Sequence, residues 1–405
     1  MDVTPRMTIL NVASFSAVCF CLALAAYICF RAFESGRALP DYFKLSGVPP
    51  PNPLLEFNID KAKARPYRPF RWAYHQHMSL KKMEPDWWLE LESTYRKRIV
   101  QRKQLYAIHG KRIIDAMPGS ELACKELMEM VLQFLCARYP KQFQYDSRTG
   151  IFHNNILDTH LDIATMKPLE VLLDNIPEDF LITLQDEKTG LYVLRAGVAC
   201  SAVGWNISTK IGKPLHAIHD PVPDYKEKME FSMDRCPSRL LIKIQILIYS
   251  VCRYFSKMPC DKPIQRGSWS LEIGQPLFVQ PGDEQFESRN IQLNDLDIKD
   301  VYLRVDWQTL RRLPTSRAIV FSFKALFTPV TDFRNEPYIP KLVAKVLREG
   351  KKNLLDYKAT SHVEHCVLPA LDGWAREQEE KGWVPKDWNE RTLDEDPYFP
   401  GWNKA

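Results

Sequence analysis

The 405-residue sequence has none of the short motifs that mark the commonest classes of enzyme. It contains no GxGxxG or GxxxxGK loop, no HExxH or GxSxG motif and no CxxC pair. Nucleotide-dependent hydride transfer, phosphoryl transfer, zinc proteolysis and serine hydrolysis therefore lack support. No internal repeat is visible, and a hydrophobic fraction of 45% excludes a disordered or fibrous protein.

The sequence also has little net charge, because its formal charge is only +5. The charge is unevenly spread, and basic residues dominate between Lys61 and Arg112. Such a segment could meet nucleic acid or an anionic lipid surface, but the solvated face of a helix explains it as well. We therefore expect no nucleic-acid partner.

One long segment, residues 9–30, has no charged side chain at all. About 20 apolar residues in a helix span the hydrocarbon layer of a bilayer. A cleaved signal peptide has a shorter apolar region, of roughly 7 to 15 residues, after a basic start, and here only Arg6 precedes the run. The pattern predicts a retained, single-pass transmembrane anchor, with the membrane as a partner.

The flanking charges and the cysteines predict that the part after the anchor faces the cytosol. Arg31, Arg37 and Lys44 follow the apolar run, whereas Arg6 alone precedes it, and positive charge favours the cytosolic side. An odd number of cysteines without short paired spacing fits a reducing compartment. Those beyond the anchor are Cys124, Cys136, Cys200, Cys236, Cys252, Cys260 and Cys366.

The chain is expected to have four parts. These are the anchor at 9–30, a proline-rich linker at 31–56, one large domain at 57–375 and a C-terminal tail at 376–405. Within the large domain, apolar periodicity predicts helices at 86–109, 120–139, 240–251, 340–348 and 361–378. The strand signals form a hairpin at 180–184 and 191–194 and further strands at 269–279, 301–305 and 318–323. Strands separated from helices predict an α+β fold with an antiparallel sheet and flanking helices.

The most informative fragment runs from Lys213 to Tyr225, where His216 and His219 stand three residues apart among three prolines. Prolines restrict the backbone, so a histidine held there could bind a metal or cofactor at a small entropy cost. A hydrogen-bonded packing histidine is the competing interpretation.

Cationic and aromatic residues later in the chain are consistent with haem as the cofactor that the histidine would bind. A haem needs an axial ligand such as imidazole, an apolar slot and cationic partners for its two propionates. The candidate slot residue is Trp269, and the candidate cations are Arg266, Arg304, Arg311 and Arg312. Surface ion pairs would explain the same arginines without a cofactor.

A second, weaker metal candidate lies near the C-terminal end. His362 and Cys366 stand four residues apart and would share one face of a helix, but a complete zinc site needs ligands from elsewhere.

Several motifs, in order along the chain, carry a resemblance to one family. They are Glu84-Pro-Asp-Trp-Trp-Leu-Glu-Leu91, Pro118-Gly-Ser-Glu-Leu122, Trp205, Ile211-Gly-Lys-Pro-Leu-His-Ala-Ile-His-Asp-Pro-Val-Pro223, Arg266-Gly-Ser-Trp269 and Leu303-Arg-Val-Asp-Trp-Gln-Thr-Leu-Arg-Arg-Leu-Pro314. Over about residues 57–333 the sequence resembles the haem-dependent oxidative N-demethylase alpha subunit family, especially its fungal members.

The resemblance implies a PAS-like domain that binds haem b through a histidine. It selects His219 as the axial iron ligand and places Arg304, Gln308 and Arg311 near the haem. Together with Arg266 and Trp269, these residues form the expected cofactor site, and no catalytic residue is assigned. The expected reaction is oxygen-dependent demethylation of a secondary amine, in which water splits an iminium into the shorter amine and formaldehyde.

Two features leave alternatives open. The sequence has no recognisable flavin, nicotinamide or iron-sulfur motif, so electrons are expected from a separate reductase. Cys236, Pro237, Ser268, Asp306 and Trp307 differ from the family pattern, which could preserve haem binding and change turnover. The alternatives are a non-catalytic haem sensor or carrier, and a membrane-tethered interaction protein that has lost haem.

Overall fold

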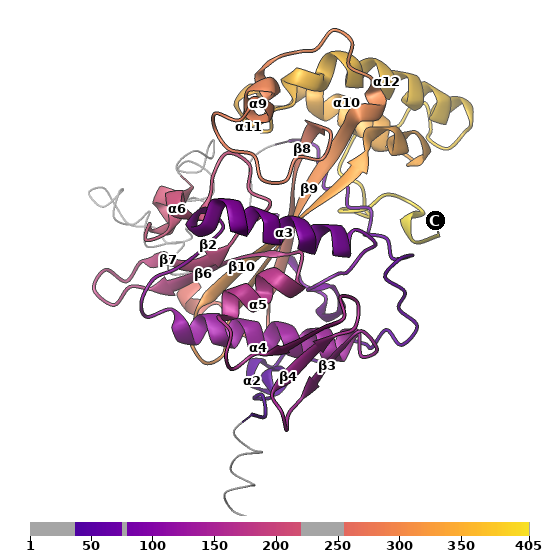
Figure 1. Ribbon diagram of the computed structural model, residues 1–405. Helices are drawn as coiled ribbons and strands as arrows, with labels where there is room; N and C mark the ends of the chain where they lie inside the picture. Colours follow the sequence, from indigo (N-terminus) through magenta and orange to yellow (C-terminus); the bar gives the residue numbers. More distant parts are fainter. Residues whose placement is uncertain (1–36, 75–78, 220–254, 405) are drawn as a thin grey trace, which may run out of the picture.

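Two antiparallel sheets organise the chain in the computed structural model, which describes residues 37–74, 79–219 and 255–404 (Figure 1). Within these residues the larger sheet has seven strands in the order β1-β8-β9-β10-β6-β7-β2, and the smaller has three in the order β3-β4-β5. Every neighbouring pair in both sheets is antiparallel. Helices combined with antiparallel sheets make an α+β fold, as the sequence predicts.

The strands and helices have the following bounds. The strands are β1 (Lys81–Lys82), β2 (Ile114–Ala116), β3 (Phe143–Asp146), β4 (Ile151–Asn154), β5 (Thr159–Asp162), β6 (Asp179–Gln185), β7 (Tyr192–Val198), β8 (Ile264–Ile273), β9 (Val301–Arg312) and β10 (Ile319–Pro329). The α-helices are α2 (Tyr42–Ser46), α3 (Tyr95–His109), α4 (Glu121–Arg138), α5 (Pro168–Asn175), α6 (Ile207–Lys210), α7 (Leu215–Ile218), α9 (Glu284–Glu287), α10 (Ile339–Glu349), α11 (Lys352–Tyr357) and α12 (Ser361–Glu380). Short 3-10 helices are η1 (Pro85–Trp87), η2 (Gly110–Arg112), η5 (Ser288–Asn290), η6 (Ile298–Asp300), η7 (Val330–Asn335) and η8 (Trp402–Lys404).

The hairpin of β6 and β7 confirms the clearest strand prediction. Asp186 accepts hydrogen bonds from the backbone N–H groups of Lys188 and Thr189, and Gly190 closes the turn with a positive φ of 71°. Two later strands are longer than the sequence predicts, since β9 continues to residue 312 and β10 to residue 329. The strand predicted at 269–279 is β8, which lies earlier, at Ile264–Ile273. The added part of β9 has polar residues on both faces, because strand alternation places Gln308 on one face and Thr309 and Arg311 on the other.

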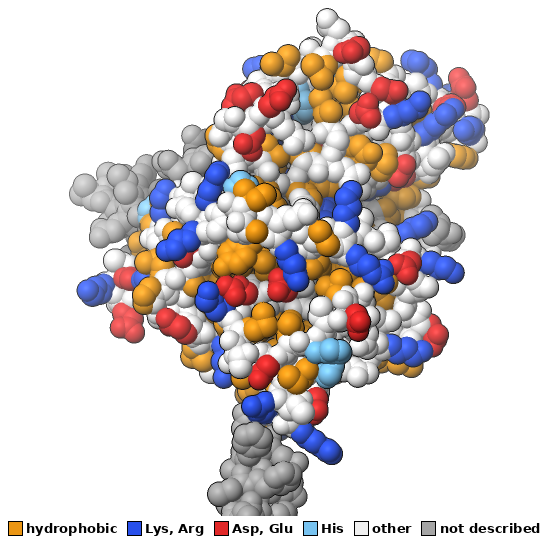
Figure 2. All heavy atoms as spheres, in the orientation of Figure 1, with side chains coloured by type: hydrophobic (Ala, Val, Ile, Leu, Met, Phe, Trp, Pro, Cys, Tyr) orange, Lys and Arg blue, Asp and Glu red, His pale blue; other side chains and the backbone are white. Residues whose placement is uncertain are grey.

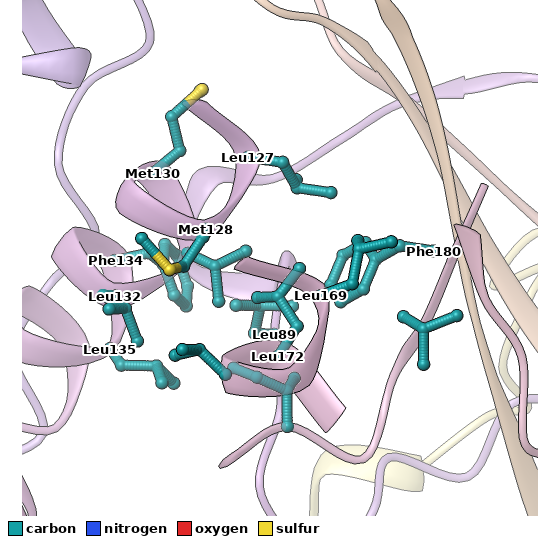
Figure 3. Close-up of a cluster of buried hydrophobic side chains, with 14 of the residues drawn as sticks. Leu89, Leu127, Met128, Met130, Leu132, Phe134, Leu135, Leu169, Leu172 and Phe180 are labelled. Atoms are coloured by element: carbon teal, nitrogen blue, oxygen red, sulfur yellow. The ribbon is translucent and has the colours of Figure 1, made fainter. Parts of the chain in front are cut away.

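One large apolar core lies between the sheet and the helices α3, α4 and α5. Figure 3 shows Leu127 and Leu135 of α4 in one cluster with Leu169 and Leu172 of α5 and with Phe180 of β6. All five side chains are buried. The periodic apolar residues of α4, predicted for residues 120–139, therefore position the helix against the sheet.

A second core holds α10 and α12 against the outer ends of β8 and β9. It contains Val343 and Leu371 from the helices and Leu303 from β9, together with Tyr398 and Phe399 of the C-terminal segment. The C-terminal segment is thus packed against the domain. Pro369 lies inside α12, which continues past it to residue 380.

The described part of the expected linker packs onto α4. Asp41 caps α2 by accepting a hydrogen bond from the backbone N–H of Lys44, and the buried Tyr42 hydroxyl donates to Glu129. Val48 is also buried. Residues 37–56 therefore contact the large domain along this stretch.

The basic residues between Lys61 and Arg112 do not form one continuous patch. Arg68 and Arg102 are buried and pair with Glu336 and Asp179, respectively. In Figure 2, basic, acidic and apolar side chains are interspersed on the face that carries α3. Much of this segment is therefore scaffold.

The expected transmembrane helix and single-pass membrane localisation are corrected. Across 37–74, 79–219 and 255–404, no helix is both long enough and apolar enough to cross a bilayer. The segment at 9–30 lies outside the described residues, as does the helix expected at 240–251. The described residues thus support the α+β part of the predicted fold class.

Candidate functional site

Strand alternation divides the expected site residues between the two faces of the larger sheet. Arg266 of β8 lies opposite Gln308 of β9, and Ser270 lies opposite Arg304, so these side chains share one face. We call this the site face, and the opposite one the reverse face. Three of the expected cofactor residues, Arg266, Arg304 and Gln308, are therefore together on the site face.

An apolar wall lines the site face beside these polar residues. Phe323 of β10 lies opposite Gln308, and its ring centroid is 5.9 Å from Trp205 and 5.6 Å from Phe321. Leu215 of α7 packs against a neighbouring buried cluster on this face. The buried members of that cluster are Tyr192, Phe255, Met258, Leu310 and Ile319. Apolar side chains next to polar groups are the usual composition of a small-molecule site.

His219 lies directly after α7, and its ring is oriented by that helix. Its Nδ1 is 2.8 Å from the carbonyl oxygen of Leu215, which can only accept a hydrogen bond, so Nδ1 carries the proton. In the neutral ring the lone pair then lies on Nε2. Metal-binding histidines commonly have one nitrogen fixed in this way and use the other for the metal.

The surroundings of His219 favour its neutral form. Burial lowers the pKa of His219 below its usual value, the positive charges of Lys210 and Arg266 lower it further, and the bond to Leu215 opposes the shift. A histidine must be neutral to donate its lone pair to iron. The residue that the sequence selects as axial ligand therefore has the required tautomer and charge.

Arg266 and Lys358 supply positive charge at the edge of the sheet. The buried Nε of Arg266 has no hydrogen-bond partner, and burial lowers the pKa of this guanidinium. Lys358 donates from Nζ to Ser268 Oγ at 2.7 Å, and burial together with the charge of Arg266 lowers its pKa to about 8. In the described part of the chain, neither cation has a carboxylate within ion-pair distance. The charge of Asp306 acts on Lys358 only from beyond ion-pair distance. Two cations without a directly bonded carboxylate suit a ligand with carboxylates.

Lys358 was not found by the sequence reasoning. It follows α11 and reaches Ser268 of β8, 90 residues earlier in the chain. No local motif marks it, because its position depends on how the C-terminal helices pack beside β8. The only sequence signal nearby is the Arg266-Gly-Ser-Trp269 motif, which contains the hydroxyl that Lys358 contacts.

Arg304 is on the site face, but its guanidinium N–H groups donate hydrogen bonds to other protein groups. It forms an ion pair with Asp306 at 2.9 Å, and it donates to the carbonyl oxygens of Pro276 and Ser201. Its side chain is buried. Arg304 therefore joins β9 to two loops, and its expected role near a cofactor stays a prediction.

Trp269 and Arg311 lie on the reverse face. Trp269 is buried and packs against Phe70 and Tyr74, with ring centroids 5.1 and 5.6 Å apart. Arg311 is stacked on Trp88 at 3.6 Å, and burial lowers its pKa to about 9. The structure thus separates these two residues from the wall beside His219, and their expected cofactor contacts stay untested.

The weaker metal candidate does not form a complete site. His362 is buried in α12, and Cys366 donates from Sγ to the carbonyl oxygen of Leu296. Across the described ranges, no group of three or more His, Cys, Asp and Glu side chains could hold a metal ion. A single histidine such as His219 would be supplemented by the four ring nitrogens of a haem, so this finding does not bear on haem ligation.

The site face of this α+β protein combines a histidine whose neutral form is favoured, two cations without a bonded carboxylate and an apolar wall. These features suit an anionic cofactor that carries a metal. Residues 79–368 match the family described as haem-dependent oxidative N-demethylase, alpha subunit-like. The match covers more than half of the 405 residues, and the chain belongs to this family. Membership confirms the resemblance found in the sequence and implies dependence on haem.

Proposed function

We propose that the chain is the haem-binding oxidative N-demethylase of a secondary amine, that the cofactor is haem b, and that a separate reductase supplies electrons. The single observation that carries the proposal is the state of His219, whose Nδ1 is hydrogen-bonded to Leu215 and whose pKa is lowered by burial and by the charges of Lys210 and Arg266. Family membership supplies the class of reaction.

Each group has a distinct part in this site. His219 Nε2 would hold the iron, and Arg266 and Lys358 would hold carboxylates of the cofactor. Phe321, Phe323 and Trp205 would exclude water from the apolar side. Bound haem would supply the oxygen-dependent oxidation of the methyl-bearing amine, which a protein side chain cannot perform.

The first experiment is an absorbance titration of the full chain with haem. A Soret band should appear at one equivalent and should shift when His219 is replaced by Ala. His216→Ala is the matched control, because this histidine lies three residues earlier in the same short segment and should leave the band unchanged. A colourless protein, or the same spectrum for His219→Ala and the unmodified chain, would refute His219 ligation.

The second experiment measures formaldehyde released from methylated secondary amines by the haem-loaded chain, with oxygen and a reductase. Release that requires both supports the demethylase. Haem binding without release would point instead to a sensor or carrier, and release without any reductant would contradict the proposed reductase.

A further inference from the structure

A pair of histidines faces outward from the smaller sheet, away from the site described above. His153 of β4 lies directly opposite His160 of β5. Their Nδ1 atoms are 2.7 Å apart and their ring centroids 4.7 Å apart. His160 is exposed and His153 is partly exposed, so the pair is accessible to solvent.

Two ring nitrogens at this distance cannot both carry a proton. One nitrogen must donate and the other accept, so the two rings share a single proton between their Nδ1 atoms. When that proton moves to the Nε2 of its own ring, both rings are neutral and two Nδ1 lone pairs are directed at one point. A metal dication can then take the place of the proton between the two Nδ1 atoms.

The hairpin that carries the pair is held rigidly. Asn154, fully buried at the end of β4, donates to the Tyr95 hydroxyl at 2.8 Å and to Asn175 Oδ1 at 2.9 Å. Its own Oδ1 accepts hydrogen bonds from the backbone N–H groups of Ile156 and Leu157 in the turn. The backbone beneath both rings is therefore fixed before any ligand arrives, which reduces the entropy cost of binding.

We propose that His153 and His160 form a binding site for a transition-metal dication of the Ni²⁺, Cu²⁺ and Zn²⁺ group. Imidazole nitrogens suit these metals better than Mg²⁺ or Ca²⁺, which prefer oxygen ligands. With metal–nitrogen distances of about 2.0–2.1 Å, a tetrahedral ion needs the two nitrogens about 3.3 Å apart. Small side-chain rotations that separate the rings by roughly 0.6 Å provide this spacing.

Among the described residues, the pair supplies two ligands to this ion. No third histidine, cysteine or carboxylate in the described residues completes the group, so water occupies the remaining positions. The site should therefore bind its metal reversibly, lose it to a chelator and bind more weakly in acid, where both rings are protonated. This inference is independent of haem binding and of the proposed demethylase activity.

Calorimetric titration of the haem-free full chain with Zn²⁺ at neutral pH tests the site. The unmodified chain should bind one more equivalent of Zn²⁺ than the His153→Ala/His160→Ala variant. His365→Ala is the matched control, because His365 is an exposed histidine whose Nε2 contacts only the Leu293 carbonyl among the described residues, and it should keep that equivalent. Equal Zn²⁺ binding by the unmodified chain and the double variant would overturn the proposal.

Single substitutions guard against misfolding of the double variant. His153→Gln and His160→Gln keep a polar side chain on the exposed face, and circular dichroism checks that each is folded. Each should weaken Zn²⁺ binding about tenfold or more, because each removes one of two ligands. Zn²⁺ should also raise the melting temperature of the unmodified chain and of neither single variant, since it links two strands of the folded state. Unchanged affinity in both folded single variants would equally overturn the site.

Discussion

Two regions of the molecule bury positive charge, and they differ in whether a carboxylate is bonded to it. One lies where α3 meets the start of β6, and the other where α11 meets the edge of β8. In the first region Arg102 pairs with Asp179, which also accepts hydrogen bonds from the backbone N–H groups of Cys200 and Ser201. In the second region, Arg266 and Lys358 have no carboxylate partner in the described chain. An unpaired buried charge is costly, and Asp179 offsets this cost for Arg102. Arg266 and Lys358 have no such bonded partner among the described residues.

The comparison predicts that the largest loss of folding stability follows substitution of Asp179. Asp179→Ala leaves the buried Arg102 without its counter-ion and should lower the free energy of unfolding by about 3–5 kcal/mol. Urea denaturation monitored by circular dichroism measures the change. A loss below about 1 kcal/mol, the range of a surface pair, would mean that the pair is not buried as described.

The second prediction concerns Glu178, a buried carboxyl on the reverse face whose Oε2 has no hydrogen-bond partner. Burial raises its pKa from 4.5 to about 7. The protonated form therefore favours folding: its stabilisation is complete below about pH 4.5 and is lost as the pH rises through 7.

Glu178→Gln should remove this loss, which amounts to roughly 3 kcal/mol between pH 4.5 and pH 8. Unfolding free energies of both proteins across this pH range provide the measurement. Parallel pH profiles for Glu178→Gln and the unmodified chain would show that another group is responsible.

The third prediction concerns Lys358, whose pKa burial and Arg266 lower to about 8. Without haem, the deprotonated amine favours folding, so its stabilisation is present above about pH 10.5 and is lost as the pH falls through 8. Haem binding requires the opposite form, because only the ammonium attracts a carboxylate. Haem affinity should therefore fall as the pH rises above about 8.

Lys358→Met should weaken haem binding at pH 7 by about tenfold to a hundredfold and should flatten its dependence on pH. Lys352→Met is the matched control, since Lys352 is an exposed lysine of α11. Soret titrations at pH 7 and pH 9.5 distinguish the two variants. Equal affinities for the Lys358 variant and its control would remove Lys358 from the cofactor site without affecting His219.

The smallest effect is expected at Glu377. It pairs with Arg334 on the surface, where solvent and salt screen the interaction. Glu377→Ala should leave the urea midpoint unchanged within error. A shift comparable to that of Asp179→Ala would contradict the distinction between paired charges inside the fold and paired charges on its surface.

Local patterns predicted much of the fold. The β6–β7 hairpin follows from apolar runs around the turn from Asp186 to Gly190, and α4 follows from its periodic apolar residues. Helix α3 begins at residue 95, whereas the sequence predicts 86, because Pro85 opens a separate 3-10 turn before it. These features depend on neighbours within a few residues, and such neighbours are visible in a sequence.

The site was predictable only in part. His219 and Arg266 stand in recognisable motifs, and the structure brings them close enough for the charge of one to lower the pKa of the other. Arg311 resembled a site residue as well, yet strand alternation sends it to the reverse face beside Trp88. Had β9 been predicted at its full length, the alternation alone would have separated Arg311 from Arg304 and Gln308.

The carbonyl group that fixes the tautomer of His219 belongs to Leu215, four residues earlier in the same short turn. The hydrogen bond that orients Nδ1 therefore lies within a five-residue segment. An insertion outside residues 215–219 would leave this hydrogen bond within its own segment. An iron bound at Nε2, as we propose, would thus depend on a hydrogen bond made within one short turn.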